Sequence, residues 1–79
     1  MRRMTVEVKI GVQYAAREIV VESGQTPAAV EALITAAVKD GGLLILADER
    51  GRRVLVPVEK LAYVEIGEAS ERRVGFGTM

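Results

Sequence analysis

The sequence contains no cysteine and no histidine, and these two absences remove several kinds of chemistry. Without cysteine there is no disulfide bond and no thiolate nucleophile, and without histidine there is no imidazole base. A structural zinc site is also excluded, because such sites are built mainly from these two residue types. We therefore expect no metal site and no cofactor.

Excess charge and long apolar runs are also missing. Eleven Lys and Arg residues balance eleven Asp and Glu residues, so the basic excess typical of a general nucleic-acid binder is absent. The longest apolar runs, such as Leu43–Ala47, are far shorter than a membrane span, so no membrane partner is expected. Arg2 and Arg3 precede alternating strand sequence and not the apolar segment of a signal peptide, which predicts a cytoplasmic protein.

The remaining polar residues do not form a recognisable catalytic group. Serine occurs only as Ser23 and Ser70, in contexts typical of turns. Neither GxxxxGK[ST] nor GxGxxG is present, so no phosphate-binding loop is predicted. Glutamates such as Glu7 and Glu65 occupy polar positions of strands, where cross-strand pairing explains them. We expect that the protein is not an enzyme and predict no catalytic residues.

The pattern that is present is that of a small α+β domain. Residues 4–12 alternate between apolar and polar side chains, and 17–23 read as the returning strand of a hairpin. Thr26 is a good N-cap and Pro27 a good first residue for a helix that ends at about Asp40, before Gly41. The apolar stripe predicted to pack this helix on the sheet is Val30, Leu33, Ile34, Ala37 and Val38. Three further strands are predicted at Leu43–Ala47, Arg53–Val58 and Leu61–Ile66.

The predicted order is therefore β-β-α-β-β-β in a single domain covering residues 1–79, with a core at about 5–67 and a C-terminal tail at 68–79. We expect one helix packed on a mostly antiparallel five-stranded sheet. The short link Glu59-Lys60 predicts that the last two strands are antiparallel neighbours. The alternative is a ubiquitin-like β-grasp with a mixed sheet, in which the first and last strands pair in parallel.

One helix can cover only one face of such a sheet, so apolar residues of the other face are expected to form an interface. The candidates are Val20, Leu55, Leu61 and Tyr63, with part of Leu43–Ala47 and, in the tail, the only phenylalanine, Phe76. A chain of this length buries only about 60% of its unfolded surface, so added stability is expected from association. We predict a small interaction module that forms a homo-oligomer through its open sheet face and C-terminal tail, or binds another protein there.

A second hypothesis rests on arginine. Arg50, Arg52 and Arg53 cluster at a predicted hairpin turn, and Arg72 and Arg73 lie in the tail. Guanidinium groups bind phosphates and carboxylates through paired hydrogen bonds. If the turn and the tail meet, they would bind the phosphate of a nucleotide or of RNA. The alternative is a solvated turn, with charges neutralised by the acidic residues nearby in sequence, Asp48, Glu49, Glu68 and Glu71.

Five segments resemble a known family. They are VEVKIGV (Val6–Val12), REIVVES (Arg17–Ser23), DERGRRVLVP (Asp48–Pro57), KLAYVEIGE (Lys60–Glu68) and RRVGFG (Arg72–Gly77). Together they resemble the short actinobacterial proteins grouped as domain of unknown function 3107, over nearly the whole chain from Thr5 to Gly77. The resemblance implies an actinobacterial, cytoplasmic protein. Some members are labelled ATP-binding, which implies a nucleotide ligand, but the family supplies no established function and no catalytic residues.

Overall fold

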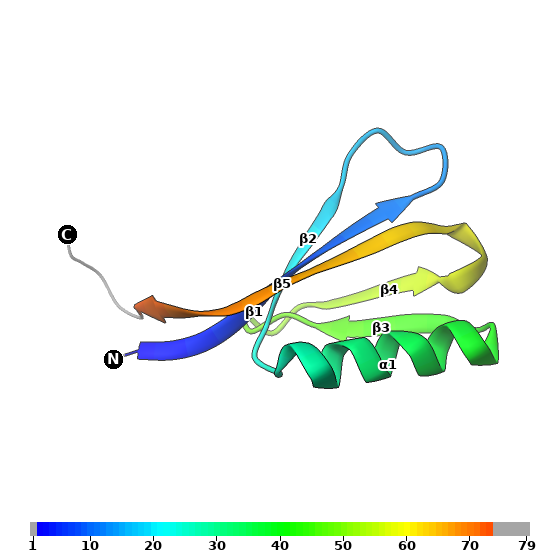
Figure 1. Cartoon of the computed structure of the whole chain (residues 1–79). Helices are drawn as coiled ribbons and strands as arrows, with labels where there is room; N and C mark the ends of the chain where they lie inside the picture. Colours follow the sequence, from blue (N-terminus) through cyan, green and yellow to red (C-terminus); the bar gives the residue numbers. More distant parts are fainter. Residues whose placement is uncertain (1, 74–79) are drawn as a thin grey trace.

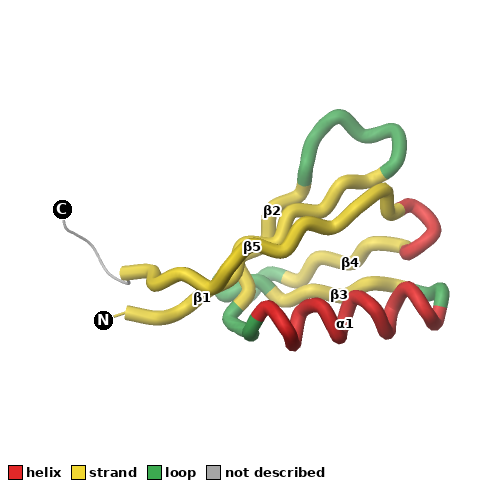
Figure 2. Tube along the Cα trace, in the orientation of Figure 1, coloured by secondary structure: helices red, strands yellow, loops and turns green. Residues whose placement is uncertain are grey.

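The computed structural model describes residues 2–73, with the side chains of residues 4–70. The described residues form one α-helix and five strands, which confirms the α+β class and the β-β-α-β-β-β order. Figures 1 and 2 show how these elements are arranged. The elements are β1 (Arg2–Val12), β2 (Ile19–Ser23), α1 (Pro27–Asp40), β3 (Leu43–Ala47), β4 (Arg53–Pro57), a short 3-10 helix η1 (Val58–Lys60) and β5 (Leu61–Arg73). No helix within residues 2–73 is both long enough and apolar enough to cross a bilayer.

The strands form two antiparallel sheets and not one sheet of five strands. One sheet has the order β2-β1-β5, and the other is the β3–β4 hairpin (Figure 2). The prediction that the last two strands pair with each other is therefore wrong, because β4 pairs with β3 and β5 pairs with β1. The physical reason lies in η1, where the chain changes sheets. The Val58 N–H still donates to the Gly42 carbonyl at 2.9 Å, but the Lys60 carbonyl already accepts from the Gln13 N–H at 2.8 Å.

The first and last strands are neighbours, as they are in a β-grasp, but their direction is antiparallel. This direction excludes the mixed sheet of the ubiquitin-like alternative. β5 also runs to Arg73, well past the predicted end at Ile66, so the first residues of the predicted tail belong to a strand. The register shifts by one residue between the pairs Val6–Ala69 and Val8–Ile66, which places a bulge on β5, and the pairing then continues to Arg73.

Beyond this bulge the two strands project from the body as a two-stranded ribbon (Figure 1). We call this ribbon, Arg2–Thr5 paired with Ser70–Arg73, the arm. The molecule is correspondingly elongated, with extents of 41 × 26 × 20 Å. An isolated pair of strands is marginally stable in water, so the arm depends on its continuity with the sheet.

The helix begins and ends where its sequence predicts. The Thr26 Oγ1 accepts a hydrogen bond from the Ala29 N–H at 3.1 Å, which satisfies an amide that the helix leaves unpaired. Gly41 follows the last turn with a φ of 75°, a left-handed conformation that favours glycine. Its N–H donates to the Ala37 carbonyl at 2.9 Å and closes the helix.

The core lies between two layers, the three-stranded sheet on one side and α1 with the β3–β4 hairpin on the other (Figure 1). Its buried side chains are Val6, Val8, Ile10 and Val21 from the sheet, Val30 from the helix, and Leu44, Leu46 and Val56 from the hairpin. The predicted apolar stripe of α1 is only partly in this core. Leu33, Ile34 and Ala37 pack against it, but Val38 is 52% exposed.

Candidate functional site

The outer face of the β3–β4 hairpin is apolar and exposed. Side chains alternate along both strands, with Leu44, Leu46 and Val56 buried in the core and Leu43, Ile45 and Leu55 exposed by 49%, 47% and 53%. Ile45 is the direct cross-strand partner of Leu55, and Leu43 is that of Pro57, so the apolar surface is continuous across the hairpin. We call this surface, made of Leu43, Ile45, Ala47, Leu55 and Pro57, the hairpin face.

The sequence of β3 explains why this face is apolar. Leu43–Ala47 is apolar at all five positions, so both faces of the strand carry apolar side chains. Continuous apolar strands of this kind are typical of sheets that are covered on both sides. Here the core covers one side, and nothing in the described part of the chain covers the other. The hairpin face is therefore an apolar sheet face that no other element of residues 2–73 covers.

The predicted interface residues do not share one face. Leu55 lies on the hairpin face, whereas Val20 and Tyr63 lie on the outer face of the three-stranded sheet, on the side opposite the core. Leu61 is partly buried and packs against the core. Phe76 lies outside the described residues. The separation follows from the two-sheet architecture, since residues predicted for one sheet are divided between two.

The outer face of the three-stranded sheet is partly polar. Tyr63 crosses this face above Gly11, its direct partner on β1, and its hydroxyl donates a hydrogen bond to the Glu18 carboxylate. That hydrogen bond is the main cause that raises the pKa of Tyr63 above 10.0, and partial desolvation and the charges of Glu18 and Glu65 act in the same direction. Next to it, Lys9 and Glu65 are cross-strand partners of opposite charge.

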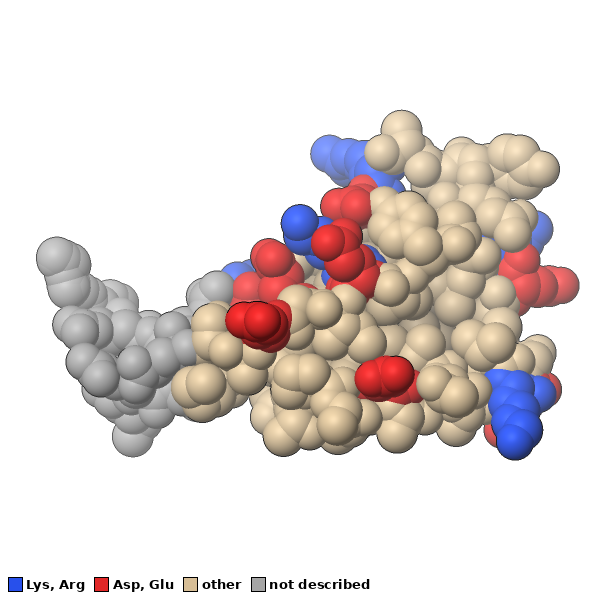
Figure 3. Space-filling model, in the orientation of Figure 1, with Lys and Arg blue, Asp and Glu red and all other residues tan. Residues whose placement is uncertain are grey.

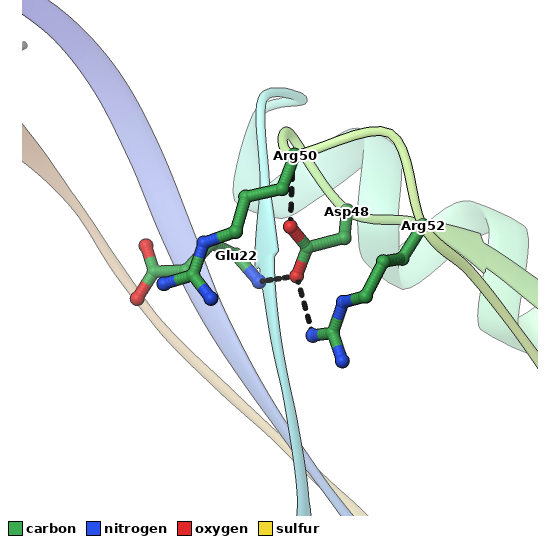
Figure 4. A network of polar contacts seen from close by, with 4 residues as sticks. All are labelled: Glu22, Asp48, Arg50 and Arg52. Atoms are coloured by element: carbon green, nitrogen blue, oxygen red, sulfur yellow. Dashed lines mark hydrogen bonds and ion pairs between the residues drawn. The ribbon is translucent and has the colours of Figure 1, made fainter.

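The turn between β3 and β4 spans residues 48–52 and contains Arg50 and Arg52, and we call it the arginine turn. It is organised by a buried carboxylate, Asp48, which is 4% exposed. Its Oδ1 accepts from the Arg50 N–H at 2.8 Å, and its Oδ2 accepts from the Glu22 N–H at 3.3 Å and from Arg52 Nη2 at 3.1 Å (Figure 4). The Arg50 amide is the largest cause that holds the pKa of Asp48 below its ordinary value. Burial opposes this shift, while Arg52 and the Glu22 amide support it. The network fastens the hairpin turn to β2.

These contacts engage some of the arginine side chains of the turn. Arg52 is ion-paired with Asp48, and the Arg50 side chain extends toward the carboxylate of Glu22 (Figure 4). The same Glu22 carboxylate accepts from Thr5 Oγ1 at 3.1 Å, and Thr5 is the cross-strand partner of Ser70. The turn therefore lies beside the base of the arm, and Arg72 and Arg73 follow a few positions further along β5.

The arm contributes two arginines that the sequence pattern did not reveal as part of an anion site. In the β1–β5 register, Arg3 is the direct partner of Arg72 and Arg2 is that of Arg73. Four arginines thus occupy the end of one two-stranded ribbon. The local pattern of each strand carries no signal for this, because it depends on which strands pair and in which register. Among the described residues, no cluster of three or more His, Cys, Asp or Glu residues could hold a metal ion.

An apolar pocket of about 350 Å³ opens between the C-terminal half of α1 and the start of β5. Its lining is Ile34 and Val38 from α1, Val58 from η1, and Leu61, Ala62, Tyr63 and Val64 from β5. β5 is an edge strand, so within residues 2–73 the edge that faces away from β1 has no partner strand. We call this pocket, together with the adjacent edge of β5, the α1–β5 groove.

Much of one surface of the molecule carries few charged side chains. Figure 3 shows acidic and basic residues gathered over the three-stranded sheet and at the end of α1, whereas the broad surface along α1 carries few charges. This agrees with the sequence of α1, where small or apolar residues such as Ala28, Ala32 and Ala36 occupy exposed positions. No local signal in the sequence indicated the groove, because Val38 continues the regular apolar stripe of the helix and only the fold leaves it exposed.

Comparison with known families agrees with the resemblance seen in the segments of the sequence. The family model described as protein of unknown function (DUF3107) matches residues 6–77, so the chain belongs to this family. No curated protein matches the sequence. Membership of this family assigns no biochemical role to the chain.

Proposed function

We propose that this member of the DUF3107 family is a small interaction module that self-associates through the hairpin face. The observation that supports this proposal is the pairing of Ile45 with Leu55 at the centre of a continuous apolar surface, with both side chains about half exposed. Contiguous exposed apolar surface is uncommon on monomeric soluble proteins and marks interfaces. Scattered apolar residues would need no such explanation, but these residues are direct neighbours across two strands.

A second copy of the chain is a suitable occupant. The five residues of the hairpin face carry no charge, and the nearest basic residue, Arg53, lies at its edge opposite Ala47. Two identical apolar faces can therefore meet across a two-fold axis without burying an unpaired charge. Covering a half-exposed Leu or Ile side chain contributes about 1 kcal/mol, and both copies gain this from the same contact.

The test is the mass of the particle in solution. Size-exclusion chromatography with light scattering should give a dimer for the natural sequence and a monomer for Ile45→Glu, because the variant buries a charge in the contact. Val20→Glu is the matched control, since Val20 is a strand residue that is 41% exposed on the other sheet. It should keep the dimer. A folded Ile45→Glu variant that dimerises as tightly as the natural sequence would contradict the proposal.

A second candidate function is phosphate binding, and one observation favours it. The register pairs Arg2 with Arg73 and Arg3 with Arg72, so four arginine positions gather at the end of one two-stranded ribbon, and this concentration of basic residues favours an anion as ligand. A nucleotide or RNA phosphate would supply that anion. The arginine turn at the base of the arm would add to the positive electrostatic potential around these residues.

Fluorescence anisotropy with a labelled single-stranded RNA and a labelled nucleotide tests this second function. Binding should be lost in Arg72→Glu/Arg73→Glu and should weaken steeply as salt is added. Arg17→Glu is the control, because Arg17 is an exposed residue of the connection between β1 and β2, at the end of the sheet away from the arm, and this variant should bind nearly as well as the natural sequence. Absence of binding at low salt would exclude this function.

A further inference from the structure

We propose that the α1–β5 groove binds the C-terminal segment Val74–Met79 of a second copy, with Phe76 in the apolar pocket. The inference deepens the proposed self-association, because it identifies a second contact between copies and the segment that makes it. Three properties support it: the nature of the groove, the composition of the segment, and the distance that separates the groove from the end of its own β5.

The groove combines the two features by which proteins bind extended peptides. The edge of β5 offers backbone hydrogen-bonding groups to an added strand, and the pocket beside it offers apolar side chains, among them Val38, which is 52% exposed. Natural proteins usually protect such an edge with charges, with proline or with a covering segment. Next to the pocket, the edge residues Leu61–Val64 include neither a charge nor a proline.

The segment Val74–Met79, with the sequence VGFGTM, matches an uncharged groove. It contains no charged side chain and holds the only phenylalanine of the chain. An aromatic side chain offers a large apolar surface for a pocket of this kind. The glycines on both sides of Phe76 carry no Cβ, so the backbone can approach the edge of β5 closely.

The segment cannot reach the groove of its own copy. An extended strand rises by about 3.3 Å per residue, so Tyr63 at the pocket and Arg73 at the end of β5 lie roughly 30 Å apart. The chain from Arg73 to Phe76 spans at most about 11 Å. Figure 1 shows that β5 does not turn back toward its start. Phe76 can therefore enter this pocket only from another copy.

In one arrangement of two copies, each copy binds the tail of the other. When the β5 edges of two copies run antiparallel to each other, the C-terminal end of each strand lies beside the start of the other. Each tail then extends toward the partner's groove, and the contact closes across a two-fold axis. Within an assembled pair the tail is present at a high effective concentration, which strengthens a contact that is weak for a free peptide.

A peptide-binding experiment tests the inference directly. The ligand is a fluorescent peptide covering residues 73–79, and the receptor is the full chain carrying Phe76→Asp, so that its own tails do not compete. We expect saturable binding of one peptide per chain and at least a tenfold loss for the peptide carrying Phe76→Asp. A receptor with the additional change Val38→Glu should lose binding, whereas Ala32→Glu, at an exposed position on the same helix, should retain it.

The results separate this inference from the proposed hairpin-face dimer. The receptor is also measured with Ile45→Glu, and peptide binding by this variant supports the groove assignment whatever its particle mass. Equal binding by the Val38→Glu and Ala32→Glu receptors, or no saturable binding to any receptor, would overturn the assignment. In that case the hairpin-face proposal would still be judged by the particle mass alone.

Discussion

Tyr63 lies directly across Gly11 on the outer face of the three-stranded sheet. A Cβ atom at Gly11 would come within 2.7 Å of Cδ2 of the tyrosine ring and closer still to its outer atoms. Gly11 is therefore required for space and not for an unusual backbone angle. The hydroxyl of Tyr63 is held by Glu18, so the ring fills the position of the missing side chain and closes part of this face.

The first prediction concerns this pair. Gly11→Ala should displace the ring and break the hydrogen bond between Tyr63 and Glu18, so the pKa of Tyr63 should fall toward 10.0. The measurement is an ultraviolet titration of the phenol in a Tyr14→Phe background, where Tyr63 is the only tyrosine. Glu18→Gln should lower the pKa as well, because it removes the negative charge that opposes ionisation. An unchanged, raised pKa in Gly11→Ala would show that the ring is held by something else.

The second prediction concerns Asp48. Because its pKa is lower in the folded state than the ordinary 3.8, its charged form stabilises the fold above that value, and this contribution is lost as the pH falls through the folded-state pKa. Asp48→Asn should lower the free energy of unfolding by about 2 kcal/mol at pH 7, since hydrogen bonds to a charged group are replaced by weaker ones.

Urea denaturation at pH 7 and at pH 3 measures this effect. The difference between Asp48→Asn and the natural sequence should be large at pH 7 and should shrink at pH 3, where the aspartate becomes protonated in the unfolded chain. Glu31→Gln, an exposed helix position, is the control and should change little at either pH. A difference that is equal at both pH values would mean that the charge of Asp48 does not contribute.

The third prediction compares two neighbours on β3. Leu44 is buried and Leu43 is 49% exposed, so the two side chains face opposite sides of the hairpin. In an Ile45→Glu background, which reports folding of the single chain, Leu44→Ala should cost about 2–5 kcal/mol. Leu43→Ala should cost well under half of that. Equal losses, measured by urea denaturation, would contradict the assignment of the outer face.

The fourth prediction follows from linkage between folding and association. If copies associate through the hairpin face, the midpoint of thermal unfolding should rise with protein concentration, since association stabilises only the folded chain. The midpoint of Ile45→Glu should depend much less on concentration, because this variant lacks the hairpin-face contact. Circular dichroism melts over a hundredfold range of concentration make the comparison, and parallel behaviour of the two proteins would count against the interface.

Local patterns predicted much of this fold. Alternation identified the N-terminal hairpin, and Thr26 and Gly41 fixed the ends of α1, because capping depends only on residues close in sequence. The pairing of β4 with β5 was predicted wrongly, since a short link is compatible with a hairpin. What distinguishes the two arrangements is a long-range contact, the hydrogen bond from the Gln13 N–H to the Lys60 carbonyl.

The candidate site was less predictable, because it also depends on contacts between residues that are far apart in the sequence. Leu55 was identified by its pattern, but its partner Ile45 belongs to a continuous apolar run whose two faces cannot be told apart without the fold. Arg2 and Arg3 joined Arg72 and Arg73 only through the register of the first strand with the last. Val38 continued a regular helical stripe, and its exposure depends on how far the sheet extends beneath the helix.

The central claim is that copies of this chain associate, and sedimentation equilibrium of the natural sequence tests it most directly. Measured from low to high micromolar concentration, the average mass should rise from that of a single chain, 8.5 kDa, to twice that value or more. A mass that stays at the single-chain value over the whole range would contradict the claim.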